Sequence, residues 1–310
     1  MDPMNVLISL HRGYGLGDAV QMSAVLKHVR KYRPHWIIDY QAEEGRECVG
    51  RGIAHNVFAY GEKQPSPHYD AEVQICLYDT WANWKDRPNT RVSSCLHERF
   101  GLEWDRECGR YEINVSDDAK ATAGILLNLV EPWPRDRSQI VAFHYIGDSS
   151  PLKKNLTDKE AIGISGVIHK FGYIPLALDW RNARPMPLST GIFTTGGYVF
   201  SQVWGRSAEM NCAVISQCAA FIGIDSGPSK CASATDTPSL VVWTGHHPAP
   251  FHDPAPNTTH LVPEGYHGLE PVCNDPDVIK WFEENHLIRT YKEDPVPEIE
   301  RWLWDTLPRV

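Results

Sequence analysis

The sequence predicts an α/β protein made of two doubly wound domains, each with a parallel sheet. Short apolar segments alternate with helical patterns in both halves of its 310 residues. A glycine-rich loop joins the first apolar segment to a helix, and residues 131–138 mix prolines with charges, as linkers do. We therefore assign an N-terminal domain to residues 1–135, a C-terminal domain to 136–280 and a helical tail to 281–310.

The N-terminal domain opens with a strand, glycine loop, helix and second strand. Residues 5–10 read NVLISL, a short apolar run that predicts a buried parallel strand. A helical pattern follows over 18–33 and stops before Pro34, and residues 36–40 form the next apolar run. This order implies a right-handed crossover between parallel strands. Two weaker strands and a closing helix are predicted at 56–60, 72–77 and 117–129.

The C-terminal half repeats this alternation of strands and helices. Strands are predicted at 140–145, 173–178, 219–224 and 239–243, and helices at 158–171 and 207–218. In the tail, a helical pattern places Trp302, Leu303 and Leu307 near one face, which needs an apolar partner. We expect this tail to pack back on the N-terminal domain.

Composition narrows the class of protein. The chain has 39 acidic and 30 basic residues, a net charge of −9, which disfavours a nucleic-acid partner without excluding a local basic patch. Its eight cysteines form no CxxC pair, so we interpret them as free thiols in a reducing cytoplasm. No apolar stretch approaches 18 residues, so we expect peripheral contact at most with a membrane.

The first candidate site is the loop that carries Gly13, Gly15 and Gly17, followed by Asp18. Glycines let a backbone approach a ligand closely, and a helix begins there. The spacing is not the GxGxxG of dinucleotide sites, and a carboxylate at Asp18 would repel a pyrophosphate. We interpret Asp18 as a general base facing a cleft, with capping of the helix as the alternative.

Two further segments fit a diphosphate. Lys153 and Lys154 follow a strand and a turn, where an ammonium group would offset the charge of a departing diphosphate; a solvated lysine pair is the alternative. Asp225, Ser226 and Gly227 lie between a strand and a short helix, a position that suits phosphate and is also an ordinary tight turn.

Two acidic or histidine-rich motifs look like metal sites, but we assign neither to a metal. Asp275-Pro-Asp277 opens a predicted helix, where the two carboxylates cap the helix start. The pair His246-His247 and the nearby His252 lack the spacing of a metal-binding motif. No metal and no cofactor are therefore expected.

In this order the motifs resemble the heptosyltransferase-like glycosyltransferases, family 9. The resemblance covers roughly residues 4–255 and is strongest over 6–34 and 221–245. It implies the GT-B fold, in which two Rossmann-like domains face a central cleft. It also implies that the acceptor binds the N-terminal domain, that a nucleotide-sugar binds the C-terminal domain, and that transfer inverts the anomeric centre without a metal.

The resemblance carries roles over to individual residues. Asp18 matches the proposed base, and one of Lys153 and Lys154 matches a lysine that contacts donor phosphate. The residues expected around the donor are Gly15, Gly17, Asp225, Ser226, Gly227 and Lys230. Lys230 departs from the family, which often has a histidine there. Trp81 and Trp84 lie in an irregular aromatic segment, 81–104, that either binds the acceptor or packs as a helix and loop.

The sequence leaves the chemistry open in several respects. The donor's base and sugar are undefined, and the acceptor is a saccharide, a protein or another hydroxyl compound such as a modified nucleobase. An epimerase or hydrolase acting on a nucleotide-sugar, and a non-catalytic binding member of the same fold, are alternatives. A nicotinamide dehydrogenase is a further alternative, disfavoured by the absence of GxGxxG.

Overall fold

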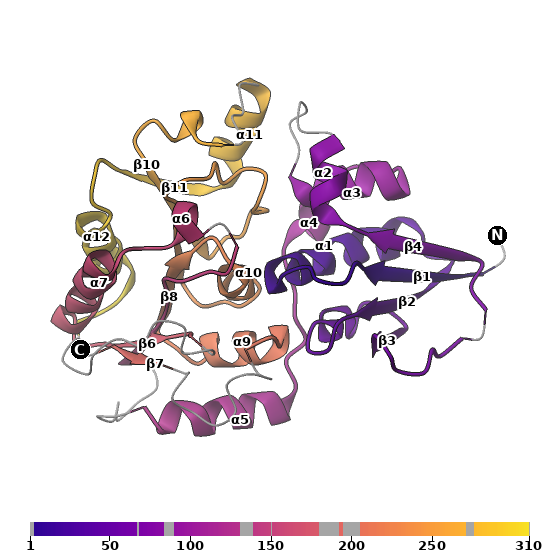
Figure 1. The fold of residues 1–310 in the computed structure, drawn as a ribbon, viewed down its shortest axis with the longest axis horizontal. Helices are drawn as coiled ribbons and strands as arrows, with labels where there is room; N and C mark the ends of the chain where they lie inside the picture. Colours follow the sequence, from indigo (N-terminus) through magenta and orange to yellow (C-terminus); the bar gives the residue numbers. More distant parts are fainter. Residues whose placement is uncertain are drawn as a thin grey trace.

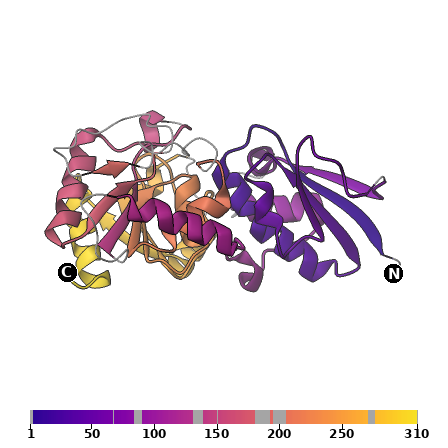
Figure 2. The ribbon, with the colours of Figure 1, turned by 90° about the horizontal axis from the view of Figure 1, so that it is seen from below.

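The computed structural model describes residues 3–66, 68–83, 90–130, 139–149, 151–179, 192–194, 205–270 and 276–309. Two parallel sheets lie side by side along the long axis of the molecule, each with helices packed against it (Figure 1). The termini lie at opposite ends of that axis (Figure 2). The predicted fold class, two doubly wound parallel-sheet domains, is thus confirmed.

The N-terminal sheet has four parallel strands in the order β3-β2-β1-β4. Its central strand β1 is flanked by β2 and β4 and is almost wholly buried, as expected for an apolar strand covered on both faces. Helix α1 begins directly after the glycine loop and buries most of its length on this sheet. The bounds are β1 (Met4–Leu10), α1 (Leu16–Tyr32), β2 (Trp36–Ala42), η1 (Glu47–Gly50), β3 (Asn56–Ala59) and β4 (Ala71–Ile75).

The segment 81–104, expected to be irregular or a helix with a loop, contains helices. They are α2 (Leu77–Asn83), α3 (Arg91–Phe100) and, just beyond, α4 (Arg106–Gly109). The Thr90 side chain accepts a hydrogen bond from the backbone N–H of Ser93 and caps the start of α3, and Gly101 ends it at φ 60°. Trp84 lies outside the described residues.

The C-terminal sheet has seven strands, all parallel, in the order β11-β10-β9-β8-β5-β6-β7. The predicted strands β5, β6, β8 and β9 form its centre, and β10 and β11 extend one edge beyond the predicted strands. The bounds are β5 (Ile140–His144), α6 (Pro151–Lys154), α7 (Asp158–Lys170), β6 (Ile174–Ala177), β7 (Phe193–Thr194), α9 (Ala208–Ile215), β8 (Ala220–Ile224), α10 (Gly227–Ser233), β9 (Ser239–Val242), β10 (Thr258–Pro263) and η5 (Tyr266–Gly268).

The structure corrects the expected packing of the tail, which lies on the C-terminal domain. Helix α11 (Pro276–Asn285), strand β11 (Leu287–Tyr291) and helix α12 (Val296–Thr306) belong to the C-terminal domain. Trp302 and Leu303 of α12 are buried in a core shared with α7. Within the tail, Trp281 does reach the N-terminal domain, where its ring meets Trp104 edge to face at 5.5 Å.

Helix α5 (Asp117–Asn128) lies across the boundary between the domains. The sequence places it in the N-terminal domain, yet it runs along the C-terminal one (Figures 1 and 2) and packs on α9. Its Leu126 and Leu127 share one apolar core with Ile215 of α9. The expected linker at 131–138 lies outside the described residues.

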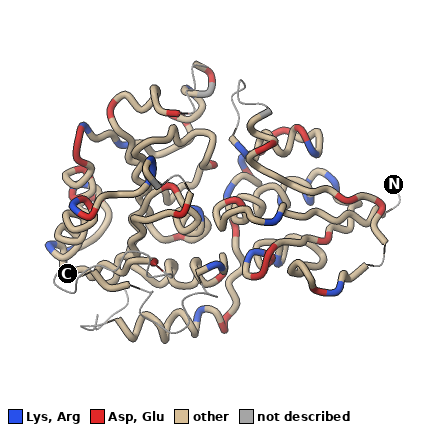
Figure 3. Tube along the Cα trace, viewed as in Figure 1, with Lys and Arg blue, Asp and Glu red and all other residues tan. Residues whose placement is uncertain are grey.

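The distribution of charged residues, apolar helices and cysteines within the described ranges agrees with the expectations from composition. Lysine and arginine are interspersed with aspartate and glutamate over both domains (Figure 3). Within the described ranges, no helix combines the length and apolarity needed to cross a membrane. The seven cysteines found there are free and buried.

Candidate active site

A cleft of about 490 Å³ lies between the two domains. The glycine loop and the start of α1 line one side, and the carboxyl ends of β5, β6 and β8 line the other. Ligand sites of open α/β sheets characteristically lie at such strand ends. Its polar lining includes Asp18, Arg46, Arg91, His144, Asp148, Lys154, Asp179, Arg206, Asp225, Ser226 and Lys230.

A glycine on each side, Gly17 and Gly227, allows the two domains to come into close contact. A Cβ added to Gly17 would lie 3.1 Å from Lys230 Cδ, and one added to Gly227 would lie 2.7 Å from Leu16 Cβ. The starts of α1 and α10 therefore touch because glycine is present on each side. Gly15 and Gly17 also line the cleft, so their expected contact with a donor remains a prediction.

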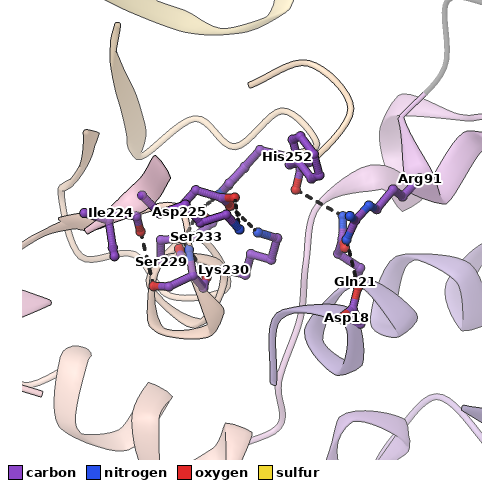
Figure 4. A network of polar contacts seen from close by, with 12 residues as sticks. Asp18, Gln21, Arg91, Ile224, Asp225, Ser229, Lys230, Ser233 and His252 are labelled. Carbon is purple, nitrogen blue, oxygen red and sulfur yellow. Dashed lines mark hydrogen bonds and ion pairs between the residues drawn. The ribbon is translucent and has the colours of Figure 1, made fainter. Parts of the chain in front are cut away.

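Asp18 caps its helix and also lines the cleft, and its role as a base remains a prediction. Its Oδ2 accepts a hydrogen bond from the Gly15 backbone N–H at 3.2 Å. Its Oδ1 forms an ion pair with Arg91 Nη1 at 3.1 Å, and 16% of the side chain is exposed. The carboxylate is thus held by Arg91 of the N-terminal domain (Figure 4), and it belongs to the lining of the cleft.

On the opposite side, Asp225 joins two lysines. Its Oδ2 lies 2.9 Å from Lys154 Nζ and its Oδ1 lies 2.8 Å from Lys230 Nζ, while only 4% of its side chain is exposed. Burial by itself would raise the pKa of Asp225, but the two ammonium groups hold it well below its usual range. Asp225 thus holds two cations in place beside the cleft, and its expected part in binding the diphosphate remains a prediction.

The structure distinguishes the two lysines that the sequence left equivalent. Lys154 lines the cleft and its side chain is 13% exposed. Lys153 points away, pairs with Glu270 at 2.5 Å and is 52% exposed. Of the two, Lys154 is placed to meet a ligand in the cleft.

Ser226 and His144 form a neutral pair beside this cluster. The Ser226 hydroxyl lies 3.0 Å from His144 Nδ1 and donates a hydrogen bond to the Ile224 carbonyl at 3.2 Å. Burial lowers the pKa of His144 to about 4, against the opposing effect of Asp179 and Asp148. His144 is therefore an uncharged hydrogen-bonding group at neutral pH.

Aromatic rings of both domains lie close to Arg91, the partner of Asp18, and to Phe251 of the cleft lining. Trp81 is buried with its ring centroid 6.0 Å from that of Phe251, so it packs in the interface instead of offering a surface to an acceptor. Tyr78, on the same helix, is half exposed. Phe251 belongs to the C-terminal domain and lines the cleft.

A buried network joins the domains behind the cleft. Asp253 accepts hydrogen bonds from Thr90 Oγ1 and from the Tyr111 hydroxyl, both at 2.9 Å. The Asp253 backbone N–H donates back to the Tyr111 hydroxyl at 2.9 Å. Burial raises the pKa of Asp253 to about 6, although these two donors act to lower it.

The structure shows where the two motifs lie that resemble metal sites and that the sequence analysis assigned to no metal. His247 and His252 are fully buried, and the ring of His247 packs on Tyr266 and Phe282. Asp277 lies in the first turn of α11, and Asp275 lies outside the described residues. Over the parts of the chain that the structure describes, no three His, Cys, Asp or Glu side chains form a metal-binding group.

Arg91, His144 and Phe251 are among the cleft residues that sequence reasoning missed. His144 ends β5 and Phe251 follows β9, and the carboxyl ends of parallel strands are where α/β sites form. That signal was available for both residues. Arg91 carries no such signal, because it begins a helix in segment 81–104, for which the sequence left an acceptor-binding insertion and a helix with a loop as alternatives.

Comparison with solved structures identifies the fold. A glycosyl transferase of family 9 from Veillonella parvula has a TM-score of 0.62 at 12% identity, covering 99% of this chain and 96% of that one. The E. coli heptosyltransferase WaaC with ADP has a TM-score of 0.55 at 14% identity, with 91% and 100% covered. The iron-containing dodecameric glycosyltransferase TibC from E. coli reaches 0.59 at 15% identity, covering 83% of this chain and 64% of that one.

No protein-family model matches the chain, and no curated protein matches its sequence. At these identities the likeness establishes the fold, which is the GT-B arrangement of the structures named above. The activity has to be argued from the side chains in the cleft.

Proposed function

We propose that this protein is a glycosyltransferase that moves a sugar from a nucleotide-diphosphate-sugar to an acceptor hydroxyl. One observation carries the proposal: a carboxylate from one domain, Asp18, and an ammonium group from the other, Lys154, line the same cleft. A base at the attacking hydroxyl and positive charge at the leaving diphosphate both promote displacement at an anomeric carbon. The shared fold with WaaC and TibC, whose structures include ADP and ADP-D-beta-D-heptose respectively, supports an ADP-linked donor as the first to test.

In this mechanism Asp18 acts as general base. The acceptor oxygen attacks the anomeric carbon while its proton passes to Asp18, and the bond from that carbon to the diphosphate breaks. Proton removal by a positioned base contributes typically about 10²–10⁴-fold to such a rate. The exposed face of the Asp18 carboxylate is the feature that suits it to the role, since Asp225 is buried and paired twice.

The negative charge that develops on the departing diphosphate is stabilised from the C-terminal domain. Lys154 lies at the cleft surface and Lys230 behind it, and both are held by Asp225. Fixed charges in a closed, water-poor site act more strongly than the same charges in water. Lys230 thus takes the place of the family histidine as a cation near the leaving group.

A single displacement of this kind inverts the anomeric centre, and with two lysines at the leaving group it requires neither a metal nor a cofactor. The acceptor, whether a saccharide, a protein or another hydroxyl compound, is expected on the side of the N-terminal domain, which carries Asp18. The free, buried cysteines found in the described ranges fit a reducing, cytoplasmic setting.

The first experiment measures thermal stabilisation by ADP, GDP, UDP, CMP and NAD at equal concentrations. A ligand at about 100 times its dissociation constant stabilises a protein by roughly 2.7 kcal/mol, which is readily measured. We expect a shift with one nucleoside diphosphate, with ADP as the leading candidate. A shift with NAD alone, or with none of the diphosphates, would contradict the proposal.

The second experiment replaces the base. Asp18→Ala should lower turnover of the nucleotide-sugar identified by the first experiment about 100-fold or more. Binding of the nucleoside diphosphate should stay within a few-fold of the wild type, because Asp18 does not belong to the lysine cluster. Unchanged turnover would remove Asp18 from the role of base.

A further inference from the structure

Residues Thr90 and Arg91, at the start of α3, attach the N-terminal domain to one loop of the C-terminal domain. The Arg91 backbone N–H donates a hydrogen bond to the Pro250 carbonyl at 3.0 Å. Beside it, Thr90 Oγ1 donates to Asp253 Oδ1 at 2.9 Å. The loop 248–253 therefore fixes the backbone from which the Arg91 side chain extends.

The Arg91 side chain connects this loop to the candidate base. Its Cζ lies 4.5 Å from the centroid of the Phe251 ring, and its Nη1 lies 3.1 Å from Asp18 Oδ1. A guanidinium group over an aromatic face gains more when the contact is shielded from water, and both side chains are largely buried here. The cation that holds Asp18 thus rests on a ring from the other domain.

The backbone of Phe251 is also held by α1, the helix that carries Asp18. Gln21, three residues after Asp18, donates a hydrogen bond from Nε2 to the Phe251 carbonyl at 3.2 Å. The same ring has Lys154 Nζ at 5.7 Å from its centroid. Phe251 therefore contacts the partner of the base as well as the cation expected at the leaving group.

We propose that Arg91 and Phe251 are positioning residues that hold Asp18 in its reactive orientation only while loop 248–253 is seated against the N-terminal domain. The inference rests on the proposed function of Asp18 and extends it, because it makes the base depend on both domains. The Arg91 guanidinium group is long enough to pair with Asp18, and the Phe251 ring fixes the position of that guanidinium group.

The test measures ADP release from ADP-heptose by the full-length protein, with water as the acceptor, and ADP affinity by calorimetry. Arg91→Gln and Phe251→Leu should each lower kcat at least tenfold and change the ADP dissociation constant less than threefold, because Lys154 keeps its ion pair with Asp225. The conservative variants Arg91→Lys and Phe251→Tyr should restore most of the rate, since they retain the charge and the ring.

Arg110→Gln is the matched control. It removes an ion pair that links the two domains, from Arg110 Nη2 to Asp236 Oδ1 at 2.6 Å, and that involves no residue of the cleft. Its kcat should stay within twofold of the wild type. The double variant Arg91→Gln/Phe251→Leu should lose little more than the larger single loss, because both changes remove one arrangement, whereas independent losses would multiply.

The outcomes separate this inference from the proposed function. Two results would overturn the inference alone. In the first, the wild type releases ADP and the rates of Arg91→Gln and Phe251→Leu stay within twofold of it. In the second, the two single losses multiply in the double variant. No release and no ADP binding by the wild type would count against the proposed function. In that case urea unfolding still decides the positioning: Arg91→Gln and Phe251→Leu should be non-additive in stability, whereas Arg110→Gln and Phe251→Leu should add.

Discussion

Each side of the cleft has an aspartate paired with cationic side chains, but the two aspartates differ in burial and in the number of their partners. On the N-terminal side Asp18 has one arginine partner and an exposed face. On the C-terminal side Asp225 has two lysine partners and is almost completely buried. The first carboxylate keeps an exposed part toward the cleft, as the proposed base requires, whereas the second is enclosed between the two cations that it holds in position.

Because both residues are aspartates, the difference between them comes from burial and from the number of cationic partners. Two neighbouring ammonium groups hold the pKa of the Asp225 carboxylate well below its usual range, which makes it a weak proton acceptor. The same cluster presents Lys154 to the cleft with its position fixed in advance. Each of the following predictions tests one part of this contrast.

The largest effect is expected from Asp225→Asn. Removing one partner from a buried ion pair typically costs about 3–5 kcal/mol, and here two ammonium groups would be left without their anion. Urea unfolding at pH 7 measures the loss. The control is Asp236→Asn, which breaks the exposed pair with Arg110 and should cost about 0–1 kcal/mol. Equal losses for the two variants would show that Asp225 is not structural.

Acid should destabilise the protein through histidines of the C-terminal domain. Burial lowers the pKa of His144 to about 4 and of His252 to about 3, so the unfolded chain, with an ordinary pKa near 6.5, takes up protons first as pH falls. Stability is therefore lost from pH 6.5 toward 4, by up to about 1.4 kcal/mol per pH unit and histidine.

Asp253 acts in the opposite direction. Burial raises its pKa to about 6, so the folded state binds a proton over part of this range and offsets one histidine. Urea midpoints at pH 7.5 and pH 5 measure the net effect. His144→Gln should reduce the difference between the two midpoints, and an unchanged midpoint across this range would rule out the histidine contribution.

Contact between the two sides is tested by Gly227→Ala. The added methyl group would lie 2.7 Å from Leu16 Cβ, so the starts of α1 and α10 have to separate. Overpacking of this kind costs typically about 1–3 kcal/mol. Gly166→Ala in α7 is the control, because a Cβ there meets no atom within 4 Å, and it should be neutral or slightly stabilising. A neutral Gly227→Ala would mean that this contact is dispensable.

The smallest effect distinguishes the two adjacent lysines. Lys154→Met should weaken ADP binding about tenfold, equivalent to about 1.4 kcal/mol, because it removes a cation from the cleft surface. Lys153→Met should change ADP affinity less than twofold, because Lys153 pairs with Glu270 outside the cleft. Calorimetry on both variants provides the comparison. Equal losses would assign both lysines to the donor site.

The strands and helices of the core were largely predictable. Apolar runs such as 5–10 and 219–224 have the length and composition of buried parallel strands, and the structure has β1 and β8 there. Strands β10 and β11 were missed. Their sequences, TTHLVP and LIRTY, mix polar with apolar residues, so the apolar pattern alone was too weak.

The candidate site was predictable only where a motif marked it. Asp18, Lys154 and Asp225 follow strands or turns that the sequence signals, and the structure brings them to one cleft. Arg91 and Phe251 are separated by 160 positions and meet only because two domains pack together. Sequence spacing carries no information about such contacts.

By itself the sequence determined the α/β class, the order of the main strands and helices, and the position of the glycine loop. These follow from local periodicity and from the backbone freedom of glycine, which act over a few residues. The tertiary structure alone decided that the tail packs on the C-terminal domain, that Lys154 rather than Lys153 faces the cleft, and that Asp225 is buried between two lysines. Burial and long-range charge pairing are properties of the packed domains, because they arise from groups that the chain brings together only on folding.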